Sequence, residues 1–360
     1  MRSLTHIFRI FVRMKYSIIV PVYNRPDEVD ELLQSLGRQT YKDFEVIIVE
    51  DGSTRDCRSV VEKYSGQMDV KYFAKPNSGP GQSRNYGAER ATGDMLIVLD
   101  SDVVLPDGYM QAVDSEMKQE PAEAFGGPDA SHPSFTDVQK AISYSMTSFF
   151  TTGGIRGGKH KLDKFYPRSF NMGIRRDIYS QLGGFSKMRF GEDIDFSYRI
   201  VEAGYRPRLF PDAWVWHKRR TDFRKFFRQV YNSGIARINL EKRHPGTLKL
   251  VHLLPTVFTV GVIILILVSA FGRAMMYYDA SNWRSWYWVA LLPWLPILLY
   301  SLIIFIDSSI RNKSLRVGLL SVPAAFVQLM GYGFGFIESW WKRCVLKQDE
   351  FTAFEKNFYS

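Results

Sequence analysis

The sequence predicts an α/β domain built on a mostly parallel β-sheet, followed by three transmembrane helices. Over roughly the first two-thirds of the 360 residues, short apolar runs alternate with segments of helical periodicity. That alternation is typical of a parallel, doubly wound sheet. In the last third, three long stretches contain no Asp, Glu, Lys or Arg, as helices that cross a bilayer require.

The length suits two structural units rather than one small domain. Changes in composition divide the chain into five expected segments. These are a basic amphipathic arm or incidental extension at 1–13, an α/β domain at 14–235, a basic juxtamembrane segment at 236–249, three transmembrane helices within 250–345, and a C-terminal tail at 346–360.

The elements of the α/β domain follow from apolar runs, helical spacing and turn residues. Pro26 suits the first turn of a helix, and the apolar residues after it recur every three or four positions. In chain order we expect strands at 16–22, 44–49, 70–73, 95–99, 170–174 and 207–210, and helices at 26–36, 56–64, 82–91, 176–181 and from 192 onward.

Two carboxylates, Asp100 and Asp102, close the buried strand that begins at Met95. Side chains two positions apart on an extended chain point to the same face, and ligands of open α/β sheets bind beyond the carboxyl ends of the strands. Two hard oxygen donors at that place suit Mn²⁺ or Mg²⁺, with a bound diphosphate completing the coordination. An isolated Asp-Ser-Asp could equally form an ordinary turn, so the rest of the chain decides between these interpretations.

Polar residues also follow the second strand. Asp51 could accept a hydrogen bond from a ribose hydroxyl or a base N–H, and Gly52 and Ser53 expose backbone N–H groups. Each feature alone is ordinary turn chemistry. Their expected position beside Asp100 and Asp102, at the same edge of the sheet, favours a nucleotide site.

The three uncharged stretches, at 251–272, 286–306 and 317–337, each reach the roughly 20 apolar residues that a helix needs to cross the hydrocarbon core. Tryptophans at their edges resemble interfacial anchors: Trp283, Trp286, Trp288, Trp340 and Trp341. The alternative, that these are buried helices of a large soluble core, is the weaker interpretation.

The net charge of +10 is concentrated before the first stretch, where ten Lys or Arg between 218 and 249 face only Asp222 and Glu241. Basic residues in that place bind anionic headgroups and mark a cytoplasmic flank. No nucleic-acid motif accompanies them, so we expect membrane lipids and no nucleic acid as partners. Cys57 and Cys344 lie far apart, and we expect no disulfide, in keeping with a reducing cytoplasm.

Four motifs, taken in order, resemble those of family 2 glycosyltransferases: Ser-Ile-Ile-Val-Pro-Val-Tyr-Asn at 17–24, Val-Glu-Asp-Gly-Ser at 49–53, Asn-Ser-Gly-Pro-Gly-Gln-Ser-Arg-Asn at 77–85 and Asp-Ser-Asp at 100–102. The resemblance covers about residues 15–235, and the ordered set is specific although each piece alone is weak. It implies the GT-A fold, a Rossmann-like and mostly parallel sheet, and metal-dependent, inverting transfer of a sugar from a UDP- or GDP-linked donor.

The resemblance also implies roles for single residues. The donor nucleotide would be held by Pro21, Tyr23, Asn24, Asp51, Asn77, Arg84, Asp100 and Ser101. Asp102 would bind the metal, His217 matches the position of a metal-binding histidine in many GT-A enzymes, and Asp100 is a further candidate ligand.

The second half of the domain is expected to hold the acceptor. The acceptor region would include Asn171, Met172 and Gly173, and the glycine-rich loop at 153–158 would lie over the diphosphate.

The same half is expected to supply the base. Glu192 and Asp193 resemble the family's base motif, whose second residue acts, so Asp193 is expected to take the proton, with Glu192 in reserve. Glu192 could instead only stabilise a helix start. Asp195 and Arg199 are spaced as a structural i,i+4 ion pair.

These features predict a membrane-anchored inverting glycosyltransferase of the bacterial inner membrane, with a cytoplasmic catalytic domain. It would move one sugar to a lipid-linked or membrane-associated glycan acceptor. No Gln-x-x-Arg-Trp follows Asp193, which departs from processive synthases and favours one sugar per encounter. A processive polysaccharide synthase remains the first alternative. The second is a catalytically inactive sugar-nucleotide-binding scaffold, against which the intact Asp100, Asp102 and Asp193 argue.

Overall fold

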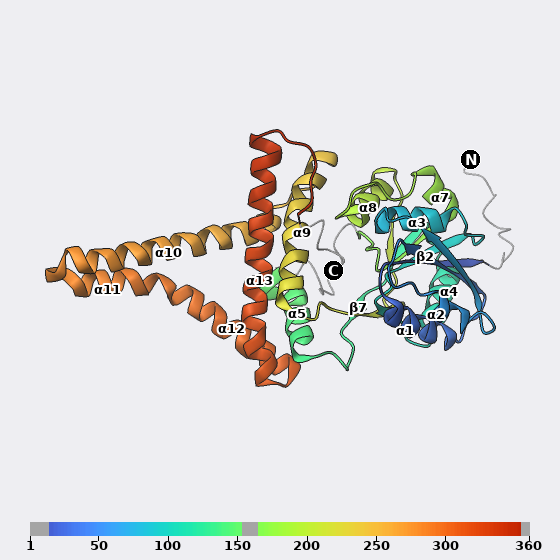
Figure 1. The fold of residues 1–360 in the computed structure, drawn as a ribbon, viewed down its shortest axis with the longest axis horizontal. Helices are drawn as coiled ribbons and strands as arrows, with labels where there is room; N and C mark the ends of the chain where they lie inside the picture. Colours follow the sequence, from blue (N-terminus) through green and yellow to red (C-terminus); the bar gives the residue numbers. More distant parts are fainter. Residues whose placement is uncertain (1–13, 153–164, 354–360) are drawn as a thin grey trace, which may run out of the picture. The chain divides into compact units, whose positions relative to one another are not determined.

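The structure is a computed structural model that describes residues 14–152 and 165–353 (Figure 1). Contacts divide these residues into two compact units. The first holds 14–130 and 165–217, and the second holds 131–152 and 218–353. The predicted arm at 1–13 and the predicted loop at 153–158 lie outside the described residues.

A seven-stranded sheet forms the centre of the first unit, with strand order β3-β2-β1-β4-β8-β6-β9. Strands β1, β2 and β4 are rich in Ile and Val and almost wholly buried, which suits positions covered on both faces of a sheet. The strands are β1 (Tyr16–Val22), β2 (Phe44–Asp51), β3 (Asp69–Lys75), β4 (Met95–Leu99), β6 (Ala124–Gly126), β8 (Asn171–Arg175) and β9 (Arg208–Leu209).

The direction of these strands decides where polar side chains can meet. Strands β1, β2, β3 and β4 pair in parallel, so their carboxyl ends share one edge. Strand β8 runs antiparallel to β4 with Leu99 opposite Asn171, so the start of β8 lies beside the end of β4. The predicted GT-A-like sheet is therefore confirmed as a mixed sheet whose first four strands are parallel.

Helices cover both faces of the sheet, because alternate strand residues feed two separate cores. Ile18 and Ile48 belong to one core cluster with Leu32 of the first helix. Ile19 and Ile47 belong to the other, with residues of the helices that follow β3 and β8. The helices of this unit are α1 (Pro26–Gly37), α2 (Arg58–Glu62), α3 (Pro80–Ala88), α4 (Tyr109–Gln119), α7 (Arg176–Gln181) and α8 (Glu192–Glu202).

A second, three-stranded sheet lies in the same unit, in the order β5-β10-β7. Its strands are β5 (Val103–Val104), β7 (Asp129–Ala130) and β10 (Val215–His217). Strand β10 runs antiparallel to β5 with His217 opposite Val103. This register brings the end of the chain segment 205–217 next to the acidic residues that follow β4.

The second unit is helical. It contains α5 (Asp137–Thr147), α6 (Phe149–Thr152), α9 (Phe223–Arg243), α10 (Leu254–Tyr278), α11 (Trp283–Leu291), α12 (Leu295–Asn312) and α13 (Leu315–Trp340). Short 3-10 segments at Leu250–Leu253, Ala280–Asn282 and Leu292–Trp294, and a π-helical turn at Trp341–Val345, complete it. Three segments, Leu250–Tyr278, Ala280–Asn312 and Leu315–Val345, are long and apolar enough to cross a membrane by length and composition.

The division differs from the expected boundary at residue 235. Helix α9 belongs to the helical unit because its apolar face packs along α13, and Phe226 and Val230 share a core cluster with Ile142 of α5. Residues 131–152, which lie inside the α/β domain in sequence, therefore belong to the helical unit in space.

Candidate active site

Asp100, Asp102 and His217 form a cluster at the end of β4. One ligand atom from each residue lies within 4.8 Å of the others, so the predicted convergence of the two carboxylates is present. Nε2 of His217 lies 3.3 Å from Oδ1 of Asp102, and the imidazole stacks on Phe170 at 5.0 Å between ring centroids. Two carboxylates and an imidazole are donors that Mn²⁺ accepts readily. The residues present therefore fit a divalent cation.

Arg25 also reaches this cluster, which the sequence analysis did not anticipate. Its Nη1 donates to Oδ2 of Asp102 at 2.6 Å. Arg25 lies just beyond the end of β1, and β1 is the direct neighbour of β4, so a basic residue there is well placed to meet the acids. The sequence places Arg25 after the first strand, but its pairing with Asp102 is visible only in the structure.

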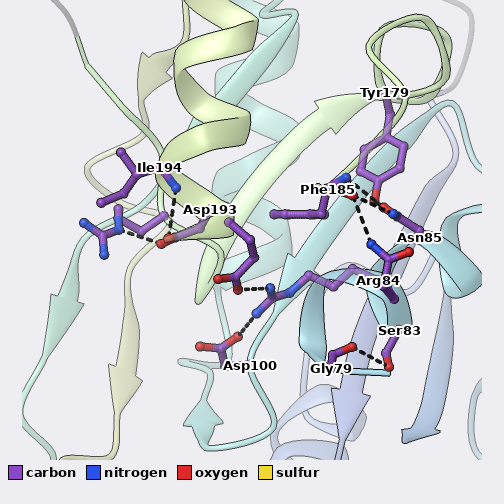
Figure 2. Close-up of polar contacts among 12 residues, drawn as sticks. Gly79, Ser83, Arg84, Asn85, Asp100, Tyr179, Phe185, Asp193 and Ile194 are labelled. Carbon is purple, nitrogen blue, oxygen red and sulfur yellow. Dashed lines mark hydrogen bonds and ion pairs between the residues drawn. The ribbon is translucent and has the colours of Figure 1, made fainter. Parts of the chain in front are cut away.

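Arg84 joins the two acidic motifs. It lies on α3, its side chain is only 3% exposed, and it donates to Oδ1 of Asp100 and to Oε1 of Glu192, each at 2.8 Å. Figure 2 shows Arg84 extending towards Asp100. The guanidinium also lies over the ring of Phe185, 5.0 Å from its centroid. Arg84 was predicted to bind the donor nucleotide, and here it couples the end of β4 to the start of α8.

The neighbouring residue, Asn85, holds the loop that leads into α8. Its Nδ2 donates to the carbonyl oxygen of Phe185 at 2.8 Å, and its Oδ1 accepts from the backbone N–H of Phe185 at 2.8 Å (Figure 2). The hydroxyl of Tyr179 donates to the same Oδ1 at 2.6 Å. Gly184, with φ of 63°, makes this close approach feasible, because a Cβ at that position would lie 2.4 Å from Oδ1. These bonds hold the loop before α8 in place at Phe185.

Asp193, the predicted base, is buried at the first turn of α8. Its Oδ2 accepts from Nε of Arg168 at 2.7 Å, and its Oδ1 accepts from the backbone N–H of Ile194 at 2.9 Å. Burial alone would raise the pKa of Asp193, but the Arg168 guanidinium outweighs burial and holds the pKa below its ordinary value. Arg168 lies outside every motif and was not predicted. Further along the helix, the predicted ion pair is confirmed, with Asp195 and Arg199 3.1 Å apart.

Glu192 is in a different electrostatic state although it is adjacent. Burial raises its pKa to about 7, because the loss of water outweighs the attraction of Arg84, and the charge of Asp193 adds to the rise. Asp193 therefore stays ionised far below neutral pH, whereas Glu192 gains or loses its proton near neutral pH.

This difference gives a pH test of which carboxylate takes the proton. If Asp193 is the base, the transfer rate at saturating donor and cation should stay level as the pH falls from about 8 to about 5.5, because Asp193 remains ionised. If Glu192 is the base, the rate should fall about tenfold for each unit below about 7, as its carboxylate is protonated. The pH–rate profile of Glu192→Gln is the control, since an acidic limb that persists in this variant does not come from Glu192.

Asp51, at the end of β2, makes more hydrogen bonds within the protein than the sequence predicted. Asp51 accepts from the backbone N–H groups of Ser78 and Gly79 at 2.9 Å each, and it also pairs with Lys75. Nδ2 of Asn77 donates to the carbonyl oxygen of Asp51 at 2.8 Å. The carboxylate thus shapes the turn between β3 and α3. A role in nucleotide binding stays a prediction, which would use the remaining acceptor capacity of its oxygens.

Asn24 plays a similar part at the end of β1. Its Oδ1 accepts from the backbone N–H groups of Thr54 and Arg55 at 2.8 and 2.9 Å, which ties the β1 loop to the β2 loop. Its φ of 54° is the left-handed conformation that Asn tolerates. Of the other predicted donor residues, Pro21 pairs with Val49 inside the sheet, Tyr23 follows β1, and Ser101 is buried between Asp100 and Asp102.

The predicted acceptor region is not a surface. Asn171 is fully buried, and it bonds to Tyr109 and to the carbonyl oxygen of Ala213 at 2.7 and 2.8 Å. Met172 is fully buried in the core, and a Cβ at Gly173 would overlap the ring of Phe125. The expectation fails because β8 is an internal strand between β4 and β6, so its side chains pack inward on both faces.

Residues 17–183 match the family model described as Glycosyl transferase family 2. This segment, slightly less than half of the chain, is therefore similar to that family. The match begins in β1 and includes the ends of β2 and β4, which carry Asp51, Asp100 and Asp102, but it stops before α8 and His217.

Relatives agree with this assignment. An uncharacterized glycosyltransferase of Rickettsia felis is 32% identical over 137 residues, which are 38% of this chain and 22% of that protein. The GalNAc(5)-diNAcBac-PP-undecaprenol beta-1,3-glucosyltransferase of Campylobacter jejuni is 33% identical over 115 residues, which are 31% of this chain and 37% of that protein. The chain spans less than a quarter of the length of the first curated relatives that it matches.

One solved structure extends the likeness over most of the chain. The mannosyltransferase of Pyrobaculum calidifontis, solved with GDP-Man and Mn2+, superposes with a TM-score of 0.55 at 15% sequence identity. The superposition covers 92% of this chain and 89% of that one. At this identity the likeness shows the fold, a GT-A-like domain, and no more.

Proposed function

We propose that this protein transfers one sugar from a nucleotide-sugar donor, UDP- or GDP-linked, to a lipid-linked or membrane-associated glycan acceptor, with inversion at the anomeric carbon. The observation that carries the proposal is the meeting of Asp100, Asp102 and His217 at the end of β4, joined through Arg84 to Glu192 of α8. The family 2 domain and the named relatives support sugar transfer.

In the proposed reaction, the acceptor hydroxyl oxygen attacks C1 of the donor sugar from the face opposite the diphosphate. The bond between C1 and the diphosphate oxygen breaks, and the nucleoside diphosphate leaves with the bonding electrons. Asp193 takes the hydroxyl proton as the new bond forms. Arg168 keeps Asp193 ionised and oriented at 2.7 Å, so the carboxylate is ready to accept.

Asp100, Asp102 and His217 would hold a divalent cation, Mn²⁺ or Mg²⁺. When bound, the cation supplies positive charge against the diphosphate. The donor set fits, since three candidate ligand atoms lie within 4.8 Å of one another and Nδ1 of His217 is buried without a hydrogen-bond partner among the described residues.

We place the enzyme in the bacterial inner membrane, with its catalytic unit on the cytoplasmic side. The uncharged helices and the basic stretch at 218–249 support this placement. The printed name of the Campylobacter jejuni relative contains PP-undecaprenol, which supports a lipid-linked acceptor here.

The experiment that tests the function is donor cleavage by the purified full-length protein. The protein in detergent is incubated with Mn²⁺, a lipid-linked acceptor mixture and a panel of UDP- and GDP-sugars, and the released nucleotide is identified. Release of one nucleotide that depends on Asp193 supports the proposal. Tight binding of a nucleotide sugar without release from any member of the panel would favour a binding scaffold instead.

Replacing Asp102 with alanine tests the cation site. We expect the affinity for Mn²⁺ to fall by more than the 10–100-fold typical of losing an outer-shell partner, because a direct ligand is removed. Calorimetric titration with Mn²⁺ measures this without turnover. Asp107→Ala is the matched control, because this carboxylate lies five residues away, is 64% exposed and pairs with Arg38. Equal Mn²⁺ affinity of the two variants would contradict the site.

Attachment to the membrane is tested on the intact chain. Because the α10 and α12 segments expose apolar side chains along their length, the full-length protein should stay in the membrane fraction after washes with high salt and alkaline carbonate. Only detergent should release it. Recovery in the salt wash would mean that basic residues alone hold the protein to the lipid surface.

A further inference from the structure

Helices α9 and α13 of the helical unit run side by side in the same direction. Their contacts advance in steps of four residues: Gly331 lies against Phe227, Gly335 against Tyr231, and the hydroxyl of Ser339 donates to the carbonyl oxygen of Ile235 at 3.2 Å. Small residues at every fourth position let two helix backbones approach closely. The two helices are therefore at the same depth along most of the length of α9.

Helix α9 cannot be a membrane span. Its longest stretch without a charged residue is 229–236, which lies between Arg228 and Arg237. Eight residues extend only about 12 Å in a helix, against a hydrocarbon core of about 30 Å. Arg224 and Lys225 at its start are exposed, and Lys242 and Arg243 close its last turn.

Because α9 and α13 pack side by side, the charges that prevent α9 from crossing the bilayer also constrain α13. The first-turn residues of α9, Arg224 and Lys225, and also Arg228, lie level with residues 328–332 of α13, inside its uncharged stretch 317–337. If α13 stood across the bilayer, these cations would be held in the hydrocarbon core, which is strongly unfavourable. Helix α13 meets the length and composition of a span, but its neighbour does not allow it to be one.

Helices α10, α11 and α12 form a hairpin that extends away from α13 (Figure 1). Its two ends sit on α13: the hydroxyl of Thr259 donates to the carbonyl oxygen of Leu329 at 3.3 Å, and Ser308 bonds to Ser321 at 2.7 Å. Between these ends, 260–272 and 285–306 carry no charge and extend about 20 and 33 Å. The tip carries exposed aromatic residues suited to a headgroup region: Tyr277, Tyr278 and Trp283.

The C-terminal residues return to α9. Asn232 exchanges two hydrogen bonds with the backbone of Ala353, at 2.9 and 3.1 Å, and Arg243 pairs with Glu350 at 2.8 Å. Segment 346–353 thus lies on the same basic helix that precedes the hairpin.

We propose that only the hairpin of α10 and α11–α12 crosses the bilayer, and that α9 and α13 lie together along the lipid surface at its base. The chain then crosses twice, and residues 341–353 stay on the side of the catalytic unit. The occupant of the surface is a bilayer with anionic headgroups, which the exposed Arg224 and Lys225 match in charge. This inference rests on the proposed membrane attachment.

A native thiol provides the test. Cys344 is exposed in the turn after α13, whereas Cys57 is buried. In sealed inside-out vesicles and in intact cells expressing the full-length protein, a charged, membrane-impermeant maleimide is applied from one side at a time. Cys344→Ser is the control that shows Cys57 to be silent. In that background, Ser65→Cys reports the side of the catalytic unit and Ser281→Cys reports the hairpin tip, since both positions are exposed.

We expect Cys344 to react from the same side as Ser65→Cys and from the side opposite to Ser281→Cys. Reaction of Cys344 from the side of Ser281→Cys means three crossings and overturns the proposal, while the membrane attachment stands. Reaction of all three thiols from one side means no crossing and overturns both. Release of nucleotide from the donor by each variant verifies that it is folded.

Discussion

Replacing Asp193 with asparagine is expected to lower the rate of sugar transfer by about 10²–10⁴-fold, the usual contribution of a positioned proton acceptor. Asparagine keeps the shape of the side chain and can still bond to Arg168, but it cannot take a proton from the acceptor. Donor affinity should change little, because Asp193 lies at the start of α8 and not in the cluster after β4. Single-turnover rates and donor titrations on the same preparation separate the two quantities.

Glu192→Gln is the matched control, since it removes a neighbouring carboxylate from the same helical turn. Its effect on rate should be smaller, because Glu192 bonds to Arg84 rather than facing the acceptor in the proposed mechanism. If Glu192→Gln is the inactive variant and Asp193→Asn turns over normally, the base is misassigned by one residue. Normal turnover of both variants would remove the proton-transfer mechanism altogether.

Arg84→Met is expected to be the most destabilising single change in the catalytic unit, by about 3–5 kcal/mol. Arg84 is 3% exposed and compensates two carboxylates, so its loss leaves Asp100 and Glu192 without their main cation. The effect is measured as a fall in the thermal unfolding midpoint of the full-length protein in detergent. The readout is the resistance of the catalytic unit to protease digestion at each temperature.

An exposed ion pair gives the comparison. Arg38 is 47% exposed and pairs with Asp107, so Arg38→Met should cost less than about 1 kcal/mol. Adding Glu192→Gln to Arg84→Met should restore part of the lost stability, because one of the two uncompensated charges is then neutral. Equal melting of Arg84→Met and Arg38→Met would show that the bridge contributes nothing.

The parts of the site that sequence predicts are those set by strand periodicity. Asp100 and Asp102 converge because they follow a buried parallel strand and are two positions apart. His217 was predicted only from the family resemblance, since its place depends on the antiparallel register of β10 with β5, and strands of two and three residues leave little trace in a sequence. Arg25 and Arg168 were missed because their partners are decided by tertiary contacts with Asp102 and Asp193.

The boundary of the catalytic unit was missed for a related reason. Helix α5 has an apolar face of ordinary spacing, which reveals that it packs against something but not which element. The structure pairs Ala141 with Val317 and Ala324 of α13, far along the chain. The acceptor region was predicted at 170–174 because a short apolar segment has the same sequence pattern in an edge strand and in an internal strand. The structure shows an internal strand, β8, between β4 and β6.

The insertion of α5 into the catalytic segment has a consequence during translation. Its buried residues Ala141 and Ile142 are covered by α9 and α13, which the ribosome reaches roughly 80 to 180 residues later. At about 5–20 residues per second, that delay lasts roughly 4 to 37 s. During this interval the nascent catalytic domain carries an apolar helix with no partner, while its own sheet is already complete in sequence at residue 217. The order of synthesis, and not the chemistry of the site, makes α5 the place where chaperone binding would assist production of this protein.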